Sequence, residues 1–134
     1  MVDLSKYDDL DLLIAVIRGE AEAEPFIGKL AVACVIRNRV NDKRWPNSYR
    51  DVILQPKQFS CFMDGFFRPG ILMHEHDKLW WRECRFAAWG ILHDCVGDIT
   101  KGANHYYAHY IDTPYWAEGK TPVFEVDKHR FYAL

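Results

Sequence analysis

The sequence predicts an α+β fold, because apolar residues at helical spacing fill the first part of the chain and short aromatic segments between turn residues fill the last part. The chain has 134 residues, a length that a single hydrophobic core accommodates. It carries no repeat, low-complexity tract or linker. We therefore expect residues 1–134 to form one domain.

Three helices are predicted in the N-terminal part. The first covers residues 9–22, where Asp8 or Asp9 can serve as its cap. Its apolar side comprises Leu10, Leu13, Ile14, Ile17 and Ala21. Pro25 is expected to open the second helix as its first residue, and that helix extends to about Val40. Asn47 is expected to cap a short third helix through Leu54.

A longer helix is predicted over residues 76–94, after an ordered loop over residues 55–70. Its apolar stripe comprises Trp80, Cys84, Ala87, Ala88, Ile91 and Cys95. Its other side is either a solvated face or a cationic, aromatic binding surface, made of Lys78, Arg82, Arg85, Trp89 and His93. From Gly97 on, turn residues separate aromatic segments within 103–110 and 123–132, which predict a small β-sheet.

Charge and hydropathy restrict the partners of the chain. Its net charge is −2, whereas a general nucleic-acid binder needs a basic patch, so we expect no nucleic-acid partner. No apolar run approaches the ~20 residues of a membrane span, so we expect no membrane insertion. The N-terminal residues lack the basic and apolar regions of a signal peptide. We expect a monomer that is made in the cytoplasm and reaches any external substrate by a non-secretory route.

The cysteines and histidines show no metal-ligand pattern. Neither C-x-x-C pairing nor zinc-ligand spacing connects the four cysteines, which are Cys34, Cys61, Cys84 and Cys95, and reduced thiols are expected. His74-x-His76 and His105-x3-His109 lack the glutamate and third ligand of a zinc peptidase motif. We therefore expect no metal ion and no cofactor.

An acidic run at the end of the first predicted helix offers candidate reactive groups. Glu20, Glu22 and Glu24 alternate with alanines before Pro25. At about 100° per residue, Glu20 lies on the core side near Ile17, and Glu22 points to solvent. The direction of Glu24 is left open because the chain breaks at the proline. The run is either a solvated helix end or the location of a reactive carboxylate.

Position favours Glu20 as the reactive carboxylate. A carboxylate at the edge of an apolar stripe loses hydration, and this raises its pKa. A glutamic acid that stays protonated near neutral pH is the group needed to protonate a glycosidic oxygen. Gly19 has no side chain, so a substrate could approach the backbone beside Glu20.

Short motifs follow one another in a fixed order from about residue 10 to the C-terminus. They are Gly19-Glu20-Ala21, Glu24-Pro25, Gly28, Ala31-Val32-Ala33, Asn38-Arg39-Val40, Trp45-Pro46-Asn47, Val52-Ile53, Gln55 to Cys61, Asp64-Gly65, Asp98 to Tyr106, Pro114-x-Trp116 and His129-Arg130-Phe131-Tyr132. Together they resemble the cell-wall hydrolases of the spore-cortex-lytic (SleB/CwlJ) type. This chain departs from the family in one place: the family usually reads Ile-Gly-x-His near its C-terminus, whereas Phe124 to His129 contains no glycine.

The resemblance implies a helix-rich, lysozyme-like single catalytic domain, with a groove between the helices and a small C-terminal β part. It implies peptidoglycan as the partner, cleavage of the β-1,4 bond between N-acetylmuramic acid and N-acetylglucosamine, and Glu20 in the position of the family's single catalytic glutamate. Many members are lytic transglycosylases, which leave a 1,6-anhydro-muramic end. The family includes bacteriophage lysis and tail-associated proteins, and we expect a phage-encoded member.

Two segments are expected to line the groove, because amides, hydroxyls, imidazoles and aromatic faces bind sugars. The candidate substrate-binding residues are Gln58, Phe59, Ser60, Asp64, Asn104, His105, Tyr106 and Trp116. Asp64 and Asp98 are candidates for a second carboxylate, and each is alternatively a turn-former. A lone carboxylate favours an intramolecular transglycosylation, in which the sugar's own 6-hydroxyl attacks. The alternatives are a hydrolytic muramidase, a metal-dependent wall amidase or peptidase, and a non-catalytic wall-binding module.

Overall fold

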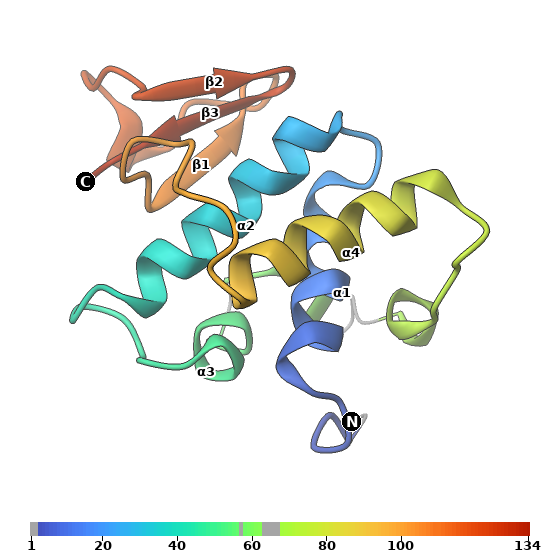
Figure 1. The fold of residues 1–134 in the computed structure, drawn as a ribbon. Coiled ribbons are helices and arrows are strands. Elements are labelled where there is room, and N and C mark those ends of the chain that lie inside the picture. The colour runs from blue at the N-terminus through green and yellow to red at the C-terminus, as the bar shows by residue number, and fades with distance from the viewer. Residues whose placement is uncertain (1–2, 57, 63–67) are drawn as a thin grey trace.

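The chain folds into a helical part followed by a small sheet, which confirms the predicted α+β class. The computed structural model describes residues 3–56, 58–62 and 68–134. The helices are α1 (Asp9–Ala21), α2 (Phe26–Val40), α3 (Tyr49–Ile53) and α4 (Leu79–Leu92), with short 3-10 helices η1 (Ser60–Phe62), η2 (Pro69–Leu72) and η3 (Tyr115–Ala117). The strands are β1 (His105–Ala108), β2 (Phe124–Val126) and β3 (His129–Tyr132). In Figure 1 the sheet lies along α2, on one side of the helical part.

Three helices enclose the hydrophobic core. Helices α1 and α2 pack against each other and against α4. Leu13 and Ile17 of α1, Ile36 of α2 and Trp81 of α4 have almost no exposed surface. Burying each large apolar side chain contributes roughly 1.5–3 kcal/mol, so these contacts hold the helices rigidly together. The last turn of α1, which carries Glu20, is therefore fixed to a well-packed scaffold.

The sheet has two faces with different surroundings. It is antiparallel, with strand order β1-β3-β2. Because side chains alternate between faces along a strand, Tyr106 shares one face with its partner Phe131 and with His129. That inner face joins the main core. His105 and Tyr107 lie on the opposite, outer face.

The turn between β2 and β3 replaces the glycine turn of the family that the sequence resembles. Val126 pairs with His129, so Asp127 and Lys128 form a two-residue connection. Asp127 has a φ of 47°, in the left-handed region that usually favours glycine. Asp is one of the residues that tolerates this conformation, because its short polar side chain can bond locally. The departure from the family pattern therefore leaves the hairpin intact.

Two helix starts differ from the prediction by one residue. Pro25 is the N-cap of α2 rather than its first residue, with an extended backbone at ψ 163°. Ser48, not Asn47, caps α3, since its hydroxyl accepts a hydrogen bond from the Asp51 amide at 3.1 Å. A hydroxyl at the N-cap reaches the amide three residues on, and Ser48 is the residue placed to do so. For α1 the prediction was correct, and Asp8 caps it.

Helix α4 is shorter than predicted, and its buried face contains a different tryptophan. It starts at Leu79 and ends at Leu92, so Cys95 lies beyond it and is exposed. Trp81 rather than Trp80 is the fully buried tryptophan. Trp80 is partly buried instead, under the guanidinium of Arg18, which lies 4.6 Å from its ring centroid. The predicted apolar stripe had the correct helical spacing, but it included Trp80 in place of Trp81.

Within the described residues, no helix has the length and apolar character needed to cross a membrane. In the same part of the chain, no three His, Cys, Asp or Glu side chains come together as metal ligands would. Each of the four cysteines is a free thiol, and Cys34, Cys61 and Cys84 are buried.

Candidate active site

An open pocket of about 260 Å³ lies where the end of α1 meets the β2–β3 turn. Residues 18–24 form one wall, and Lys128 and His129 form the other. Arg68 and Tyr110 complete its rim. The groove predicted between the helical part and the β part is therefore present, and Glu20 lines it.

Glu20 is held in this pocket by a direct bond to the sheet. The hydroxyl of Tyr106, on the inner face of β1, donates a hydrogen bond to Glu20 Oε1 at 2.5 Å. The two residues are 86 positions apart in the sequence, so this bond connects the helical part to the β part. It occupies one carboxylate oxygen and fixes the orientation of the other.

Burial dominates the electrostatics of Glu20. Burial raises the pKa of Glu20, while the Tyr106 hydrogen bond and the nearby His129 and Arg39 partly oppose that rise. The pKa of Tyr106 lies well above its usual range, because the phenol is buried and faces the Glu20 carboxylate. Tyr106 therefore stays a hydrogen-bond donor, and Glu20 keeps its proton to a higher pH than an exposed glutamate does.

Arg39 connects Glu20 to the predicted groove residues, and the sequence reasoning missed it. Its Nε donates to the Asn104 carbonyl at 2.9 Å, and its Nη1 donates to Gln58 Oε1 at 3.0 Å. The guanidinium also lies 5.9 Å from the centroid of the Phe59 ring. Burial lowers the pKa of Arg39, and the attraction of Tyr106 and Glu20 offsets part of this. The signal was available, because an arginine on the apolar side of α2 must find buried polar partners.

Among the predicted groove residues before α4, one is buried in the core and two are exposed to solvent. Phe59 is only 3% exposed and belongs to the hydrophobic core. Gln58 and Ser60 are exposed, and Ser60 begins η1. Asp64 lies outside the described residues. For Gln58, Ser60 and Asp64, substrate binding stays a prediction.

Asn104 holds the C-terminus rather than facing the pocket. Its Nδ2 donates to the Leu134 carbonyl at 2.9 Å, and its Oδ1 accepts from the Leu134 amide at 3.0 Å. The side chain is almost fully buried by these contacts. These bonds give Asn104 a structural function, and its contact with substrate stays a prediction.

His105 and Trp116 lie on the outer face of the sheet, away from the Tyr106–Glu20 bond. Their rings are 4.9 Å apart, and the ring of Trp45 is 5.9 Å from that of His105. Neither residue lines the pocket around Glu20. A contact with a more distant part of the glycan stays a prediction for both.

Asp98 is a turn-former, as the alternative interpretation held. It accepts hydrogen bonds from the Thr100 amide at 2.8 Å, the Gly102 amide at 2.7 Å and the Asn38 side chain at 3.1 Å. Burial acts to raise the pKa of Asp98, but these hydrogen bonds outweigh it and lower the pKa. A carboxylate whose oxygens are engaged in this way by a loop is poorly placed to react.

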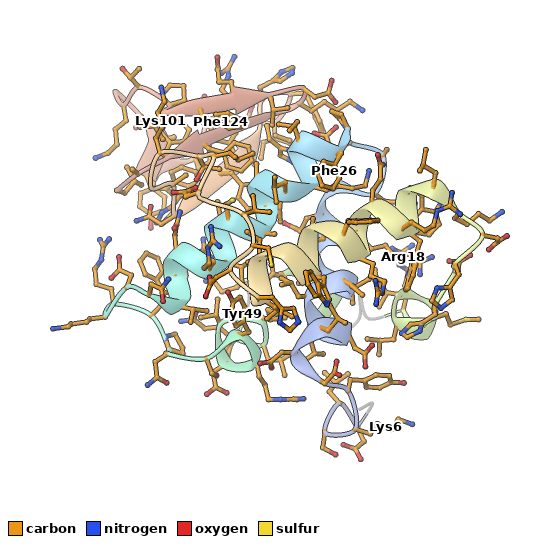
Figure 2. All side chains as sticks on the ribbon, in the orientation of Figure 1. Lys6, Arg18, Phe26, Tyr49, Lys101 and Phe124 are labelled. Atoms are coloured by element: carbon orange, nitrogen blue, oxygen red, sulfur yellow. The ribbon has the colours of Figure 1, made fainter. Side chains whose placement is uncertain are left out.

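The remaining acidic residues of the run have opposite environments. Glu22 is exposed and accepts a hydrogen bond from Arg18 Nε at 3.1 Å, as its helical phase predicted. Arg18 also binds Glu75 and lies beside the loop that leads into α4 (Figure 2). Glu24 is 6% exposed, and its Oε1 lies 2.8 Å from Nδ1 of His129. The sequence could not place Glu24, because its direction depends on how the chain turns into Pro25.

Gly19 lines the pocket and also serves the packing behind Glu20. A Cβ at Gly19 would lie 3.0 Å from Cβ and 3.1 Å from Sγ of Cys61. Ile71 follows at 3.4 Å. Gly19 lets η1 and η2 approach the last turn of α1 closely, and this fixes Glu20 from behind.

Comparison with known proteins gives concordant results. The model of the family described as Cell Wall Hydrolase matches residues 23–132, beginning just after Glu20. The spore cortex-lytic enzyme of Bacillus subtilis (strain 168) is 30% identical over 125 residues, which are 92% of this chain and 37% of the relative. That of Oceanobacillus iheyensis is 30% identical over 125 residues, 92% of this chain and 41% of the relative. The chain thus spans about two fifths of the length of these curated relatives.

Two solved structures have the same fold. The catalytic domain of the germination-specific lytic transglycosylase SleB from Bacillus anthracis superposes with a TM-score of 0.74 at 26% identity, covering 95% of this chain and 97% of that domain. The catalytic domain of the Bacillus cereus SleB protein gives a TM-score of 0.70 at 26% identity, covering 95% and 92%. The similarity extends over nearly all of both chains.

Proposed function

Because the chain belongs to the cell wall hydrolase family, we propose that it cleaves the glycan strand of peptidoglycan, with Glu20 as its acid/base carboxylate. The bond would be the β-1,4 linkage between N-acetylmuramic acid and N-acetylglucosamine. One observation carries the proposal: Glu20 lines the pocket between the two parts of the fold, with one oxygen bound by Tyr106 and with a raised pKa. The structural relative from Bacillus anthracis is described as a lytic transglycosylase, which agrees with this assignment.

The description of the structural relative as a lytic transglycosylase favours a mechanism in which Glu20 alone transfers the proton. Protonated Glu20 gives its proton to the glycosidic oxygen as the C1–O4 bond breaks. The acetamido group of the muramic sugar stabilises the anomeric carbon. Ionised Glu20 then takes the proton of the sugar's own 6-hydroxyl as the new C1–O6 bond forms. This sequence regenerates the protonated carboxyl and leaves a 1,6-anhydro end, with no water consumed.

Tyr106 supports both states of Glu20. By donating to Oε1, it leaves Oε2 as the oxygen that exchanges the proton with the substrate. Hydrogen bonds to a charged carboxylate are roughly twice as strong as those between neutral groups, so the bond strengthens when Glu20 ionises. Buried Arg39 adds a fixed positive charge on the same side.

The test is the digestion of purified sacculi with the wild-type chain, followed by mass spectrometry of the products. Anhydro-muropeptides support the proposal, reducing-end muropeptides identify a muramidase, and freed stem peptides or the absence of products contradict it. Glu20→Gln should lower the rate by about 10²–10⁴-fold, the range that general acid–base catalysis contributes. Glu118→Gln is the matched control, because Glu118 is an exposed glutamate outside the Glu20 pocket, and it should leave the rate unchanged.

We also propose that the chain is a phage-encoded enzyme that reaches the wall by a non-secretory route. The sequence resembles a family that includes bacteriophage lysis proteins, and this supports the proposal. Expression in the cytoplasm of a bacterial host should leave growth unaffected until the membrane is permeabilised, and lysis should follow at once. Lysis during expression alone would contradict it. A monomeric state and the lack of a nucleic-acid partner stay predictions.

A further inference from the structure

Glu24 and His129 approach each other from opposite walls of the pocket that contains Glu20. Glu24 comes from the turn between α1 and α2, and His129 is the first residue of β3. Glu24 Oε1 and His129 Nδ1 are 2.8 Å apart, with side chains 5% and 11% exposed. Both residues line the pocket, so a buried carboxyl–imidazole contact lies beside the reactive carboxylate.

The fold is shaped to hold Glu24 in this place. A Cβ at Gly28 would lie 3.0 Å from Cβ and 3.6 Å from Cγ of Glu24, so only glycine leaves room for this side chain. Lys29, which is 1% exposed, donates its Nζ proton to the Glu24 carbonyl and pairs with Glu83 at 3.2 Å. Burying a lysine is unfavourable unless it is paired, so these contacts define the backbone that carries Glu24.

The Asp127 carboxyl and the Lys128 backbone amide also lie beside the Glu24 carboxyl. Among the described residues, neither oxygen of the Glu24 carboxyl nor Nδ1 of His129 makes a hydrogen bond of regular geometry, although the two groups touch. Buried polar atoms are costly to leave unsatisfied, and a separation of 2.8 Å between Nδ1 and Oε1 favours a hydrogen bond between them. The charged groups that face the contact are Glu20, Asp127, Lys128 and His109.

The protonation of both groups is set by their surroundings. Burial raises the pKa of Glu24, and the neighbouring Asp127 carboxyl raises it further. Burial lowers the pKa of His129, against the pull of Glu20 and Asp127. A neutral imidazole carries one N–H, and the group that contacts Nδ1 decides which nitrogen has it.

We propose that Glu24 is a positioning residue that keeps the N–H of His129 on Nδ1, so that Nε2 accepts a hydrogen bond from a hydroxyl of the bound glycan beside Glu20. The inference rests on the proposed function for its ligand. It assigns the pocket a second contact with the sugar, supplied by the β part, opposite the carboxylate supplied by the helical part.

The first measurement is the tautomer of His129, read by long-range ¹H–¹⁵N NMR of the imidazole. In the inactive Glu20→Gln chain we expect the N–H on Nδ1. Glu24→Leu in that background removes the acceptor beside Nδ1 and should move the imidazole N–H to Nε2. An unchanged tautomer in a folded Glu24→Leu variant would overturn the proposal. This readout needs no activity, so it stands apart from the test of the proposed function.

The second measurement is the binding of a peptide-free tetrasaccharide of alternating N-acetylglucosamine and N-acetylmuramic acid to the Glu20→Gln chain. The Nε2 resonance of His129 should shift on binding, and Glu24→Leu should weaken the Kd about tenfold, the effect of one lost hydrogen bond to a buried group. His129→Gln should weaken it equally, and the double substitution no further. The proposal would be overturned if the losses of affinity in the two single variants added up in the double variant. It would also be overturned if the His129 Nε2 resonance did not shift on binding while the wild-type chain still cleaved sacculi. Glu118→Gln is the control, because Glu118 is exposed and does not line the pocket, and it should change neither reading.

Discussion

The two faces of the small sheet contain similar residues and have different surroundings. The inner face presents Tyr106 and His129 to a buried carboxylate and a pocket. The outer face presents His105 and Tyr107, whose rings pack with Trp116 at 4.9 Å and 5.8 Å. Both faces combine a histidine with a tyrosine. The composition of the sheet therefore does not identify its functional face, whereas the alternation of side chains along β1 does.

Adjacent tyrosines show the difference most directly. Burial and the Glu20 carboxylate raise the pKa of Tyr106 well above its usual range. Hydrogen bonds with Tyr132 and Arg130 lower the pKa of Tyr107. One phenol supports an acid in the pocket, and its neighbour stabilises an aromatic cluster. A shift of β1 by one residue in its register against β3 would exchange the faces, and so the functions, of these two tyrosines.

The largest effect that would test this comparison is expected from Tyr106→Phe. The change removes the hydrogen bond to Glu20 Oε1, and a hydrogen bond to a charged group contributes roughly 1.5–3 kcal/mol, so the cleavage rate should fall by about tenfold or more. Because that bond lowers the pKa of Glu20, the pKa should rise further in the variant. The pH–rate profile of both enzymes measures this. Tyr107→Phe is the matched control on the outer face, and equal losses in both variants would contradict the distinction between the faces.

A smaller effect is expected from Glu20→Gln on the thermal stability of the chain. The folded-state pKa of Glu20 is raised, so its contribution to stability is fully present below the unfolded-state pKa and is lost as the pH rises through the folded-state pKa. Glu20→Gln cannot ionise and should therefore have a higher Tm than the wild-type chain at pH 8. The difference should shrink at pH 4. Thermal unfolding at both pH values is the measurement, and a Tm difference that does not change with pH would refute the assignment.

Changes on the outer face should affect cleavage less. His105→Ala and Trp116→Ala remove ring contacts that lie outside the Glu20 pocket, so kcat should stay within about twofold of the wild-type value while the Tm falls. Steady-state kinetics on soluble glycan strands, with calorimetry alongside, separates the two outcomes. A large loss of kcat with an unchanged Tm would place these residues in the catalytic pocket after all.

The smallest effect is expected on the exposed side of α4, which combines Arg82 and Arg85 with Phe86 and Trp89, the last two 70% and 43% exposed. These cations can attract the acidic stem peptides of the wall, and attraction between exposed charges is weak and screened by salt. The Arg82→Gln/Arg85→Gln variant should bind sacculi a few times more weakly at low salt and equally at high salt. Sedimentation with sacculi measures this, and a loss that persists in high salt would exclude an electrostatic cause.

Local patterns predicted much of the fold and part of the site. Helical phase placed Glu20 on the core side and Glu22 in solvent, because both lie at the end of one regular helix. It failed for Glu24, whose direction depends on the α1–α2 turn and on the space left by Gly28. It also missed His129, since the contact with Glu24 joins segments distant in sequence. The sequence predicts that His105 and Tyr106 line one groove, whereas strand alternation places them on opposite faces of the sheet.

The close contact between Gly19 and Cys61 also bears on how the protein withstands oxidation. Burial raises the pKa of Cys61 and of Cys84 to about 12, and it raises the pKa of Cys34 as well. A thiol reacts with oxidants through its thiolate, so these three sulfurs are inert at neutral pH. An oxygen added to the Cys61 sulfur would clash with the backbone of Gly19, next to Glu20. Burial keeps this sulfur protonated and inaccessible, and so protects it from oxidation. We expect a polar alkylating reagent to label Cys95 alone in the native protein.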